Sequence, residues 1–257
     1  MNIPELLESN ARKNPEKQCL RAEGKSYSYQ TIKELSQKAA ALFQGRGIKK
    51  GDRAAIMSQN TPGFVIAFFG ILKAGGVVVP VNHKLMKPEV DYILENSGAK
   101  LFLFDGSLAE IAAKVAASVG KISLDSPARD FPHFESLLDS TSPFTPVEIA
   151  DDDLAEFLYT SGTTGKPKGC MHTHRTVIMA GVTGALAIKL DEDDRLLMAM
   201  PIWHSSPLNN WFMGMQYVGG TTVMIREYHP FTSSRESNRK NAPFILVRPS
   251  PTSCRSR

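Results

Sequence analysis

The sequence has little cysteine and no long run of apolar residues. Its three cysteines, Cys19, Cys170 and Cys254, lie far apart and form no C-x-x-C pair, which argues against a disulfide framework or a structural zinc site. The most apolar stretch, residues 63–80, is interrupted by Lys73 and by glycines, whereas a membrane span needs ~20 continuous apolar residues. A membrane span is therefore not expected.

A secretory signal is also lacking, because residues 1–5 show no basic stretch followed by an apolar one. A cytoplasmic location is the resulting expectation. The net charge of +4 gathers in residues 232–257, where six basic residues and one acidic residue give +5 and leave −1 for residues 1–231. Nucleic-acid-binding proteins usually carry a basic face interleaved with aromatic side chains. Residues 1–231 show no such face, so no nucleic-acid partner is expected, and the sequence indicates no particular oligomeric state.

Short β-branched or aliphatic runs alternate with helical patterns along most of the chain. This alternation predicts an α/β fold with a mostly parallel sheet flanked by helices. In the first half, helices are expected at residues 28–45, 62–72, 87–96 and 107–118, and strands at 53–57, 77–81, 101–104 and 121–124. Thr61 followed by Pro62 is a typical start for the second of these helices, and Gly98 lies just past the end of the third.

The chain divides at a weakly patterned connection. Residues 1–124 are expected to form an N-terminal α/β part, and the Pro- and Ser-rich residues 125–150 a connection with one short helix around 134–138. Residues 151–231 resume the alternation within the same domain. Residues 232–257 are Ser-, Arg- and Pro-rich apart from one apolar run at 244–247, and such a composition predicts a disordered tail because it buries too little apolar area.

The second part contains a strand that runs directly into a glycine-rich loop. The strand is predicted at residues 155–159 and a helix is expected to start near Thr173, an arrangement in which the loop commonly binds a ligand. A strand at 195–200, a short helix at 208–215 and a last strand at 221–225 follow.

The loop from Tyr159 to Gly169 reads Tyr-Thr-Ser-Gly-Thr-Thr-Gly-Lys-Pro-Lys-Gly. Glycines let the backbone approach an anion closely and turn its N–H groups inward, and Ser and Thr hydroxyls add donors. Lysines supply mobile positive charges, and charge-assisted hydrogen bonds contribute roughly 1.5–3 kcal/mol each. The composition therefore predicts a phosphate-binding loop.

Two other loop types do not match this string. A Walker-type loop requires a hydroxyl residue after its Gly-Lys pair, whereas Lys166 is followed by Pro167. A nucleophilic-serine elbow needs a glycine where Tyr159 stands. A flexible surface loop would explain the composition but not the whole string.

The string from Tyr159 to Gly169 resembles the phosphate-binding signature of the adenylate-forming superfamily, which includes acyl-CoA synthetases, peptide-synthetase adenylation domains and beetle luciferases. Residues 68–76 and 79–82 upstream, and residues 200–204 downstream, resemble flanking segments of that family in the same order. The resemblance covers residues 1–231. It implies the N-terminal part of a large ligase domain.

The resemblance implies an ATP-dependent carboxylic acid:CoA ligase. A fatty or aromatic acid would attack the α-phosphorus of ATP and expel pyrophosphate, and coenzyme A would then take the acyl group. ATP, Mg²⁺ and coenzyme A are the implied cofactors and co-substrates. Donors aimed at the leaving pyrophosphate would stabilise its developing charge.

The resemblance also implies roles for particular residues. Thr160 is expected to contact Mg²⁺ or a phosphate, Lys168 to screen the phosphates and His204 to line the acid pocket, and Lys168 and His204 are the candidate catalytic residues. A packed turn histidine is the alternative for His204. The implied nucleotide-binding set is Thr160, Ser161, Gly162, Thr163, Thr164, Gly165, Lys166 and Lys168.

Cys170, His172 and His174 form a C-x-H-x-H pattern that invites a metal interpretation. Alternation along a strand would place the three side chains on one face. A structural zinc ion takes four protein ligands, and the sequence offers no evident fourth one. A metal role is therefore not predicted.

Members of the superfamily are longer than this chain. The segment not matched here would hold the adenine-binding motif with its glutamate, the ribose-binding aspartate and a mobile C-terminal domain with a catalytic lysine. The loss of pattern and the rise in charge after Phe231 motivate the hypothesis that residues 232–257 come from a shifted reading frame or a truncating event. Two alternatives to an active ligase stay open: a noncatalytic remnant that binds nucleotide phosphates weakly, and an unrelated NTPase, which Lys166-Pro167 disfavours.

Overall fold

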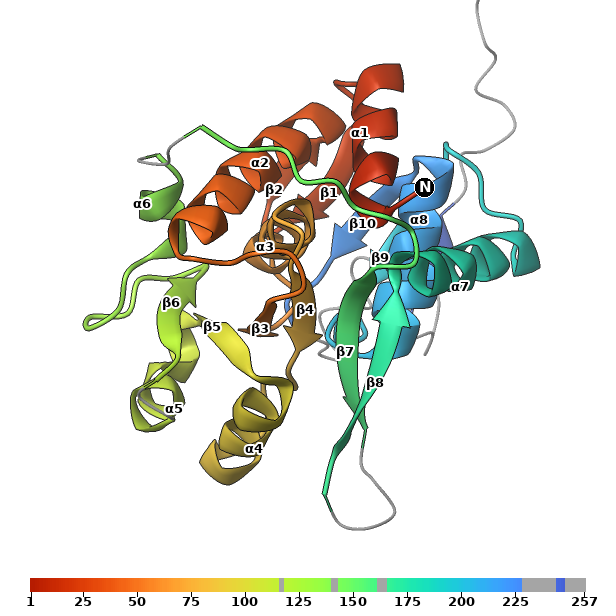
Figure 1. The fold of residues 1–257 in the computed structure, drawn as a ribbon. Coiled ribbons are helices and arrows are strands. Elements are labelled where there is room, and N and C mark those ends of the chain that lie inside the picture. Colours follow the sequence, from red (N-terminus) through yellow and green to blue (C-terminus); the bar gives the residue numbers. More distant parts are fainter. Residues whose placement is uncertain (116–117, 140–142, 161–165, 228–243, 248–257) are drawn as a thin grey trace, which may run out of the picture.

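The computed structural model describes residues 1–115, 118–139, 143–160, 166–227 and 244–247, shown in Figure 1. The predicted α/β class is confirmed. Helices and strands alternate along the chain, and a largely parallel sheet carries helices on both of its faces.

The helices and strands of the first half include every element predicted for it and some that were not predicted. They are α1 (Ile3–Lys13), β1 (Gln18–Ala22), β2 (Lys25–Ser28), α2 (Tyr29–Gly45), β3 (Arg53–Met57), α3 (Pro62–Lys73), β4 (Val77–Pro80), α4 (Lys87–Ser97), β5 (Ala99–Asp105), η1 (Gly106–Leu108), α5 (Ala109–Lys114) and β6 (Gly120–Leu124). The helix expected at 107–118 is shorter and begins as a 3₁₀ turn. Helix α1 was not predicted, although Asn2 and Glu5 form a capping box that the sequence already contains.

The second half consists of α6 (Phe134–Leu138), β7 (Leu154–Thr160), β8 (Lys168–Thr173), α7 (His174–Ala187), β9 (Arg195–Met198), the π-helix η2 (Ser206–Phe212), α8 (Met213–Val218), β10 (Thr221–Met224) and β11 (Phe244–Val247). The sequence predicted that the strand leads through the loop directly to a helix, and this prediction is wrong in one respect. Strand β8 pairs antiparallel with β7 and separates the loop from α7.

The strands form two sheets rather than one. The six-stranded sheet has the order β6-β5-β3-β4-β7-β8, and all its pairs are parallel except β7 with β8. The five-stranded sheet has the order β11-β9-β10-β1-β2, with antiparallel strands β2 and β11 at its two edges. Elements from both sides of residues 125–150 thus share each sheet, since β1 pairs with β10 and β4 with β7.

Of the segment 232–257 that the sequence assigns to a tail, the structure describes residues 244–247. The backbone of this apolar run forms β11, which pairs with β9. The remainder of the predicted tail lies outside the described residues.

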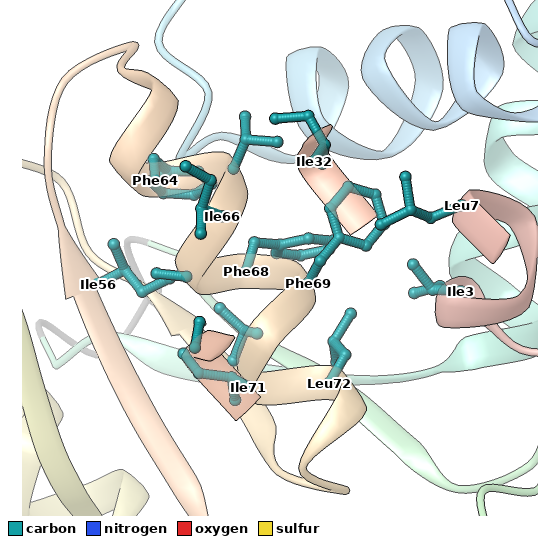
Figure 2. Close-up of a cluster of buried hydrophobic side chains, with 14 of the residues drawn as sticks. Ile3, Leu7, Ile32, Ile56, Phe64, Ile66, Phe68, Phe69, Ile71 and Leu72 are labelled. Carbon is teal, nitrogen blue, oxygen red and sulfur yellow. The ribbon is translucent and has the colours of Figure 1, made fainter. Parts of the chain in front are cut away.

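Helix α3 lies at the centre of the larger core, where all twelve of its residues are buried. Such burial suits a helix that is apolar on every side. Figure 2 shows its phenylalanines in one cluster with Leu7 of α1 and Ile32 of α2. Side chains of both sheets join the same core, for example Ile56 on β3 and Leu196 on β9.

The opposite face of the six-stranded sheet has a core of its own. Successive residues of one strand alternate between the two cores, so Leu101 and Leu103 of β5 face the α3 side while Phe102 and Phe104 face the α4 side. A sheet covered on both faces has strands that are almost continuously apolar. This explains why its central strands were recognisable in the sequence.

Among the described residues, no helix is long and apolar enough to cross a membrane. The lysine that interrupts the apolar stretch, Lys73, is 4% exposed and forms an ion pair with Glu8 of α1. Its ammonium group thereby joins the end of α3 to α1.

A close approach of α2 and α3 yields a stability prediction. A Cβ atom at Gly70 would lie 2.5 Å from the Cβ of Ala39 and 3.3 Å from the Ala39 carbonyl carbon. Gly70→Ala must push the two helices apart, and overpacking of this kind typically costs about 1–3 kcal/mol. We expect urea unfolding to show a loss of that size.

Gly45→Ala is the matched control, because Gly45 ends α2 in open space. A helical Gly-to-Ala change at an unstrained position is neutral or stabilises by about 0.4–1 kcal/mol. Equal stability of the two variants would contradict the packing described for Gly70.

Candidate functional site

The predicted phosphate-binding loop connects the two strands of a hairpin. Strands β7 and β8 pair so that Thr160 lies opposite Lys168 and Tyr159 opposite Gly169. Thr160 and Lys168, two predicted site residues, therefore flank the base of the loop, and both are exposed. The predicted residues Ser161, Gly162, Thr163, Thr164 and Gly165 lie outside the described residues.

The hairpin changes the expected electrostatics of the loop. Helix α7 begins at His174 with Thr173 as its N-cap, so the whole of β8 separates the helix N-terminus from the loop. The partial positive charge of a helix end acts within about its first turn. The N-terminus of α7 therefore adds little to the attraction for an anion at this loop.

Helix α4 supports the hairpin from one side. The Tyr159 hydroxyl donates a 2.7 Å hydrogen bond to Oδ1 of Asn96, and the Lys166 ammonium lies 5.7 Å from the centre of the Tyr92 ring. That separation is within the range of a cation–π interaction. A Cβ atom at Gly169 would lie 3.1 Å from the Tyr159 ring, so glycine there lets the ring lie across the hairpin.

His204 follows β9 in a segment that Asn60 holds in place. The Asn60 amide donates to the carbonyls of Met200 (2.9 Å) and Ile225 (3.1 Å), and its Oδ1 accepts from the Ile202 N–H at 2.7 Å. Asn60 is 2% exposed and lies just before the N-cap of α3. The exposed His204 ring is thus carried on a segment fixed by the core.

Two further observations relate His204 to the edge of the six-stranded sheet where the loop lies. Strands β4 and β7 are parallel neighbours, so the chain leaves both at the same edge, towards His83 and towards the loop. The Trp203 indole N–H donates a 3.1 Å hydrogen bond to Nδ1 of His83. His204, adjacent to Trp203, is thereby linked to the edge of the sheet at which β7 reaches Thr160.

A buried pair lies behind this edge. Glu156 of β7 is fully buried and accepts a hydrogen bond from the amide of Asn209 on η2, which is 3% exposed. Burial raises the pKa of Glu156 to about 7, and the hydrogen bond from Asn209 opposes this shift. This pair connects the strand that leads to the loop with the helix that follows His204.

The C-x-H-x-H pattern is divided between β8 and α7. Cys170 is exposed and His172 half-buried on β8, whereas His174 is buried at the start of α7. Nδ1 of His174 accepts a 3.3 Å hydrogen bond from the Ile3 N–H, and burial lowers the pKa of His174 to about 4. The His174 ring therefore joins α7 to α1 as a neutral group.

Sequence reasoning missed Asn60, His83, Glu156 and Asn209. Asn60 looked like part of an ordinary helix start, since the cap Thr61 follows it. Glu156 left a signal, because an acidic residue inside an apolar strand is costly to bury unless it is paired or neutral. The partners of His83 and Asn209 lie 120 and 53 residues away, and no local pattern reports such distances.

Asn60→Ala tests the anchor of the His204 segment. The change leaves one buried N–H and two carbonyl groups without their partner, and each such loss costs about 1–3 kcal/mol. We expect urea unfolding to show a loss of at least about 2 kcal/mol. Gln30→Ala is the control. The hydrogen bond from the Gln30 side-chain amide to Glu34 is exposed, and such pairs contribute under about 0.5 kcal/mol to stability. Similar losses in both variants would contradict the anchoring role.

Comparison with known proteins identifies the family of this chain. A family model described as AMP-binding enzyme matches residues 7–242. Crotonobetaine/carnitine–CoA ligase of Salmonella typhimurium is 34% identical, over 79% of this chain and 41% of its own length. The chain thus spans less than half the length of this relative.

Solved structures give the same result for the fold. The inhibitor-bound N-terminal domain of FACL13 from Mycobacterium tuberculosis has a TM-score of 0.81 and 29% identity, covering 91% of this chain and 59% of that domain. Apo MbtA of Mycobacterium smegmatis has a TM-score of 0.85 and 28% identity, with 92% and 46% covered. Because the family model matches most of its residues, the chain belongs to the AMP-binding enzyme family, whose acyl-CoA ligase members it resembles in sequence and fold.

Proposed function

We propose that this chain is the ATP-phosphate-binding part of an ATP-dependent carboxylic acid:CoA ligase that forms an acyl adenylate. The observation that carries the proposal is the arrangement at one edge of the six-stranded sheet. Thr160 and Lys168 flank the loop there, and His204 is linked to the same edge through Trp203 and His83. An acid held near His204 would thus lie on the side of the sheet where the phosphates of ATP are bound.

The residues of the hairpin would bind and orient the triphosphate. Lys166 and Lys168 carry positive charge at an exposed position, where it attracts ATP and offsets charge on the departing pyrophosphate. The loop hydroxyls and N–H groups would fix the direction of the phosphates, so that the acid attacks the α-phosphorus in line. His204 would orient the carboxylate.

The donor set suits a Mg²⁺ ion that arrives with the nucleotide. The described residues contain no group of three or more His, Cys, Asp or Glu side chains able to hold a metal. Thr160 offers a single hydroxyl oxygen, and Mg²⁺ commonly keeps several waters and binds through substrate phosphates. When bound, the ion would neutralise part of the phosphate charge.

The alternative is a noncatalytic remnant that binds nucleotide phosphates weakly. The aligned part of the chain corresponds to 41% of the length of the crotonobetaine/carnitine–CoA ligase. Acid-dependent pyrophosphate release separates the two functions, because only a ligase requires the acid. Crotonobetaine and carnitine, named for that relative, are the first acids to test, beside fatty and aromatic acids.

Lys168→Ala tests the phosphate site. Loss of one charge-assisted hydrogen bond of roughly 1.5–3 kcal/mol should weaken ATP binding by about tenfold or more. Titration calorimetry with Mg²⁺-ATP measures the affinity, and a coupled assay measures pyrophosphate release with and without acid. Binding that is weakened in the variant, without any release from the unmodified chain, would favour the remnant.

Lys100→Ala is the matched control for this experiment. Lys100 is 52% exposed, pairs with Asp52 and lies near the start of β5, at the opposite edge of the parallel sheet. The Lys100→Ala substitution should leave the affinity for ATP unchanged. Equal weakening by the two substitutions would mean that Lys168 acts only through net charge.

His204→Ala separates the acid site from the phosphate site. His204 is exposed, and it follows β9 in the chain rather than lying on either strand of the hairpin. We expect the acid concentration for half-maximal pyrophosphate release to rise about tenfold or more, as loss of a hydrogen bond to a charged group predicts, while ATP affinity stays within about twofold. A drop in ATP affinity with unchanged dependence on acid would assign His204 to the nucleotide instead.

A further inference from the structure

Glu156 and Asn209 form a polar pair that the ligase reaction does not account for. Glu156 lies on β7, four residues before Thr160, and Asn209 lies on η2, which begins two residues after His204. The side chains are 0% and 3% exposed. The Asn209 Nδ2–H donates a hydrogen bond to Glu156 Oε1.

Each side chain also carries one oxygen atom that this hydrogen bond does not use. Glu156 Oε2 and Asn209 Oδ1 are both buried and find no hydrogen-bond partner among the described residues. An ionised carboxylate accepts hydrogen bonds and donates none, and an amide oxygen likewise only accepts. If Glu156 were ionised, each of these two hydrogen-bonded side chains would keep one buried acceptor atom without a donor. Leaving buried acceptors unpaired costs free energy of folding.

One proton resolves both deficits. A carboxylic acid has one O–H donor and one C=O acceptor, and a primary amide has an N–H donor and a C=O acceptor. Placed face to face, the two groups can form two hydrogen bonds in a ring. The observed bond from Asn209 is one of them, and a proton on Oε2 would supply the other.

Among the described elements that pack against Glu156, none offers its carboxylate a counter-charge. Strand β4, which pairs with β7 at Val78 and Glu156, and helix η2 contain no ionisable residue, as their sequences show. On α7, Arg175 pairs with Asp151 and Asp152, and His174 bonds to Ile3. His172 lies opposite Glu156 on β8, and burial lowers its pKa, so the ring is neutral near pH 7. Lys168 and Cys170 of β8 are exposed.

We propose that Glu156 is held as a neutral carboxylic acid whose proton is donated to Asn209 Oδ1, and that this acid–amide pair fastens the phosphate-loop strand to the helix following His204. The second half of the proposal rests on the function proposed above. Glu156 and Asn209 are positioning residues that hold the ATP side and the acid side of the site in one geometry.

A neutral Glu156 would also favour the binding of phosphate at the loop. Glu156 lies about 13 Å along the strand from Thr160, at roughly 3.3 Å per residue. A buried anion at that range is poorly screened by salt and would repel the phosphates of ATP. A protonated Glu156 removes that repulsion and keeps the strand fastened.

The protonation state is tested on the whole chain without any ligand. In protein labelled with ¹³C at the glutamate side-chain carboxyl carbon, ordinary glutamates are ionised at pH 6, since their pKa is about 4.3. We expect one resonance at pH 6 at the position of a protonated acid, absent in Glu156→Gln and retained in the control Glu110→Gln, which removes an exposed carboxylate. Complete ionisation at pH 6 would overturn the proposal.

The pH dependence of stability provides a second ligand-free test. The pKa of Glu156 is about 7 in the folded chain and about 4.3 in the unfolded chain. Between these two pH values the folded chain binds more protons than the unfolded chain, so its stability falls as the pH rises. Compared with Glu156→Gln, whose amide can make the same two hydrogen bonds, the unmodified chain should therefore have a lower relative urea midpoint at pH 8 than at pH 5. Parallel profiles would refute the neutral acid.

Exchange of the two groups tests the pairing itself. Asn209→Asp leaves two acids face to face and should lower the urea midpoint at pH 7. The double variant Glu156→Gln with Asn209→Asp rebuilds an acid–amide pair with the roles reversed, and it should recover most of the loss. Without recovery, the pairing would be wrong, even if Glu156 proves to be protonated.

The positioning role is then read from ATP affinity. Asn209→Asp should weaken Mg²⁺-ATP binding by about tenfold, equivalent to 1.4 kcal/mol, and the double variant should restore it. Unchanged ATP affinity in Asn209→Asp would refute the positioning role, but it would not contradict the acid–amide pair proposed for the unmodified chain. Absence of ATP binding by the unmodified chain would count against both the proposed function and the positioning role, whereas the spectroscopic and stability results would still decide the protonation of Glu156.

Discussion

Helix α3 is buried on every side, so each element around it has to be in place before its apolar surface is covered. The surrounding elements are α1, α2, η2 and strands from both sheets. The requirement extends to single atoms, because α2 approaches α3 so closely at Gly70 that no Cβ fits. The start of α3 also determines where Asn60 lies, and Asn60 holds the segment that carries His204. The position of a candidate acid-binding residue thus follows from core packing.

The hairpin of β7 and β8 has a different relation to the core. Its first strand, β7, is a neighbour of the buried strand β4, whereas β8 forms the edge of the sheet and is largely exposed. In Figure 1 the hairpin projects away from α1–α3. Contacts with Tyr92 and Asn96 of α4 brace it near its tip. Because β8 separates α7 from the loop, the N-terminus of α7 would add little to the binding of a phosphate there.

Buried polar side chains hold the His204 segment and strand β7 in place, and they differ in how many of their polar atoms are hydrogen-bonded. Asn60 uses both of its polar atoms in three hydrogen bonds. Glu156 and Asn209 share one hydrogen bond and keep two oxygen atoms unpaired among the described residues. Since an unsatisfied buried polar atom is costly, such a pair either weakens the core or changes its protonation. A proton shared between the two side chains gives both regions a common, uncharged link.

The sequence by itself determined the α/β class, the buried central strands, the start of α3 at Thr61-Pro62 and the phosphate-loop string from Tyr159 to Gly169. These features are local, because they depend on periodicity, capping and the chemistry of adjacent residues. Only the tertiary structure decided that the strands divide between two sheets, that β8 follows the loop, and that Trp203 meets His83 and Glu156 meets Asn209. These pairings join segments far apart in the chain, and the choice of a distant partner depends on how the elements pack in three dimensions.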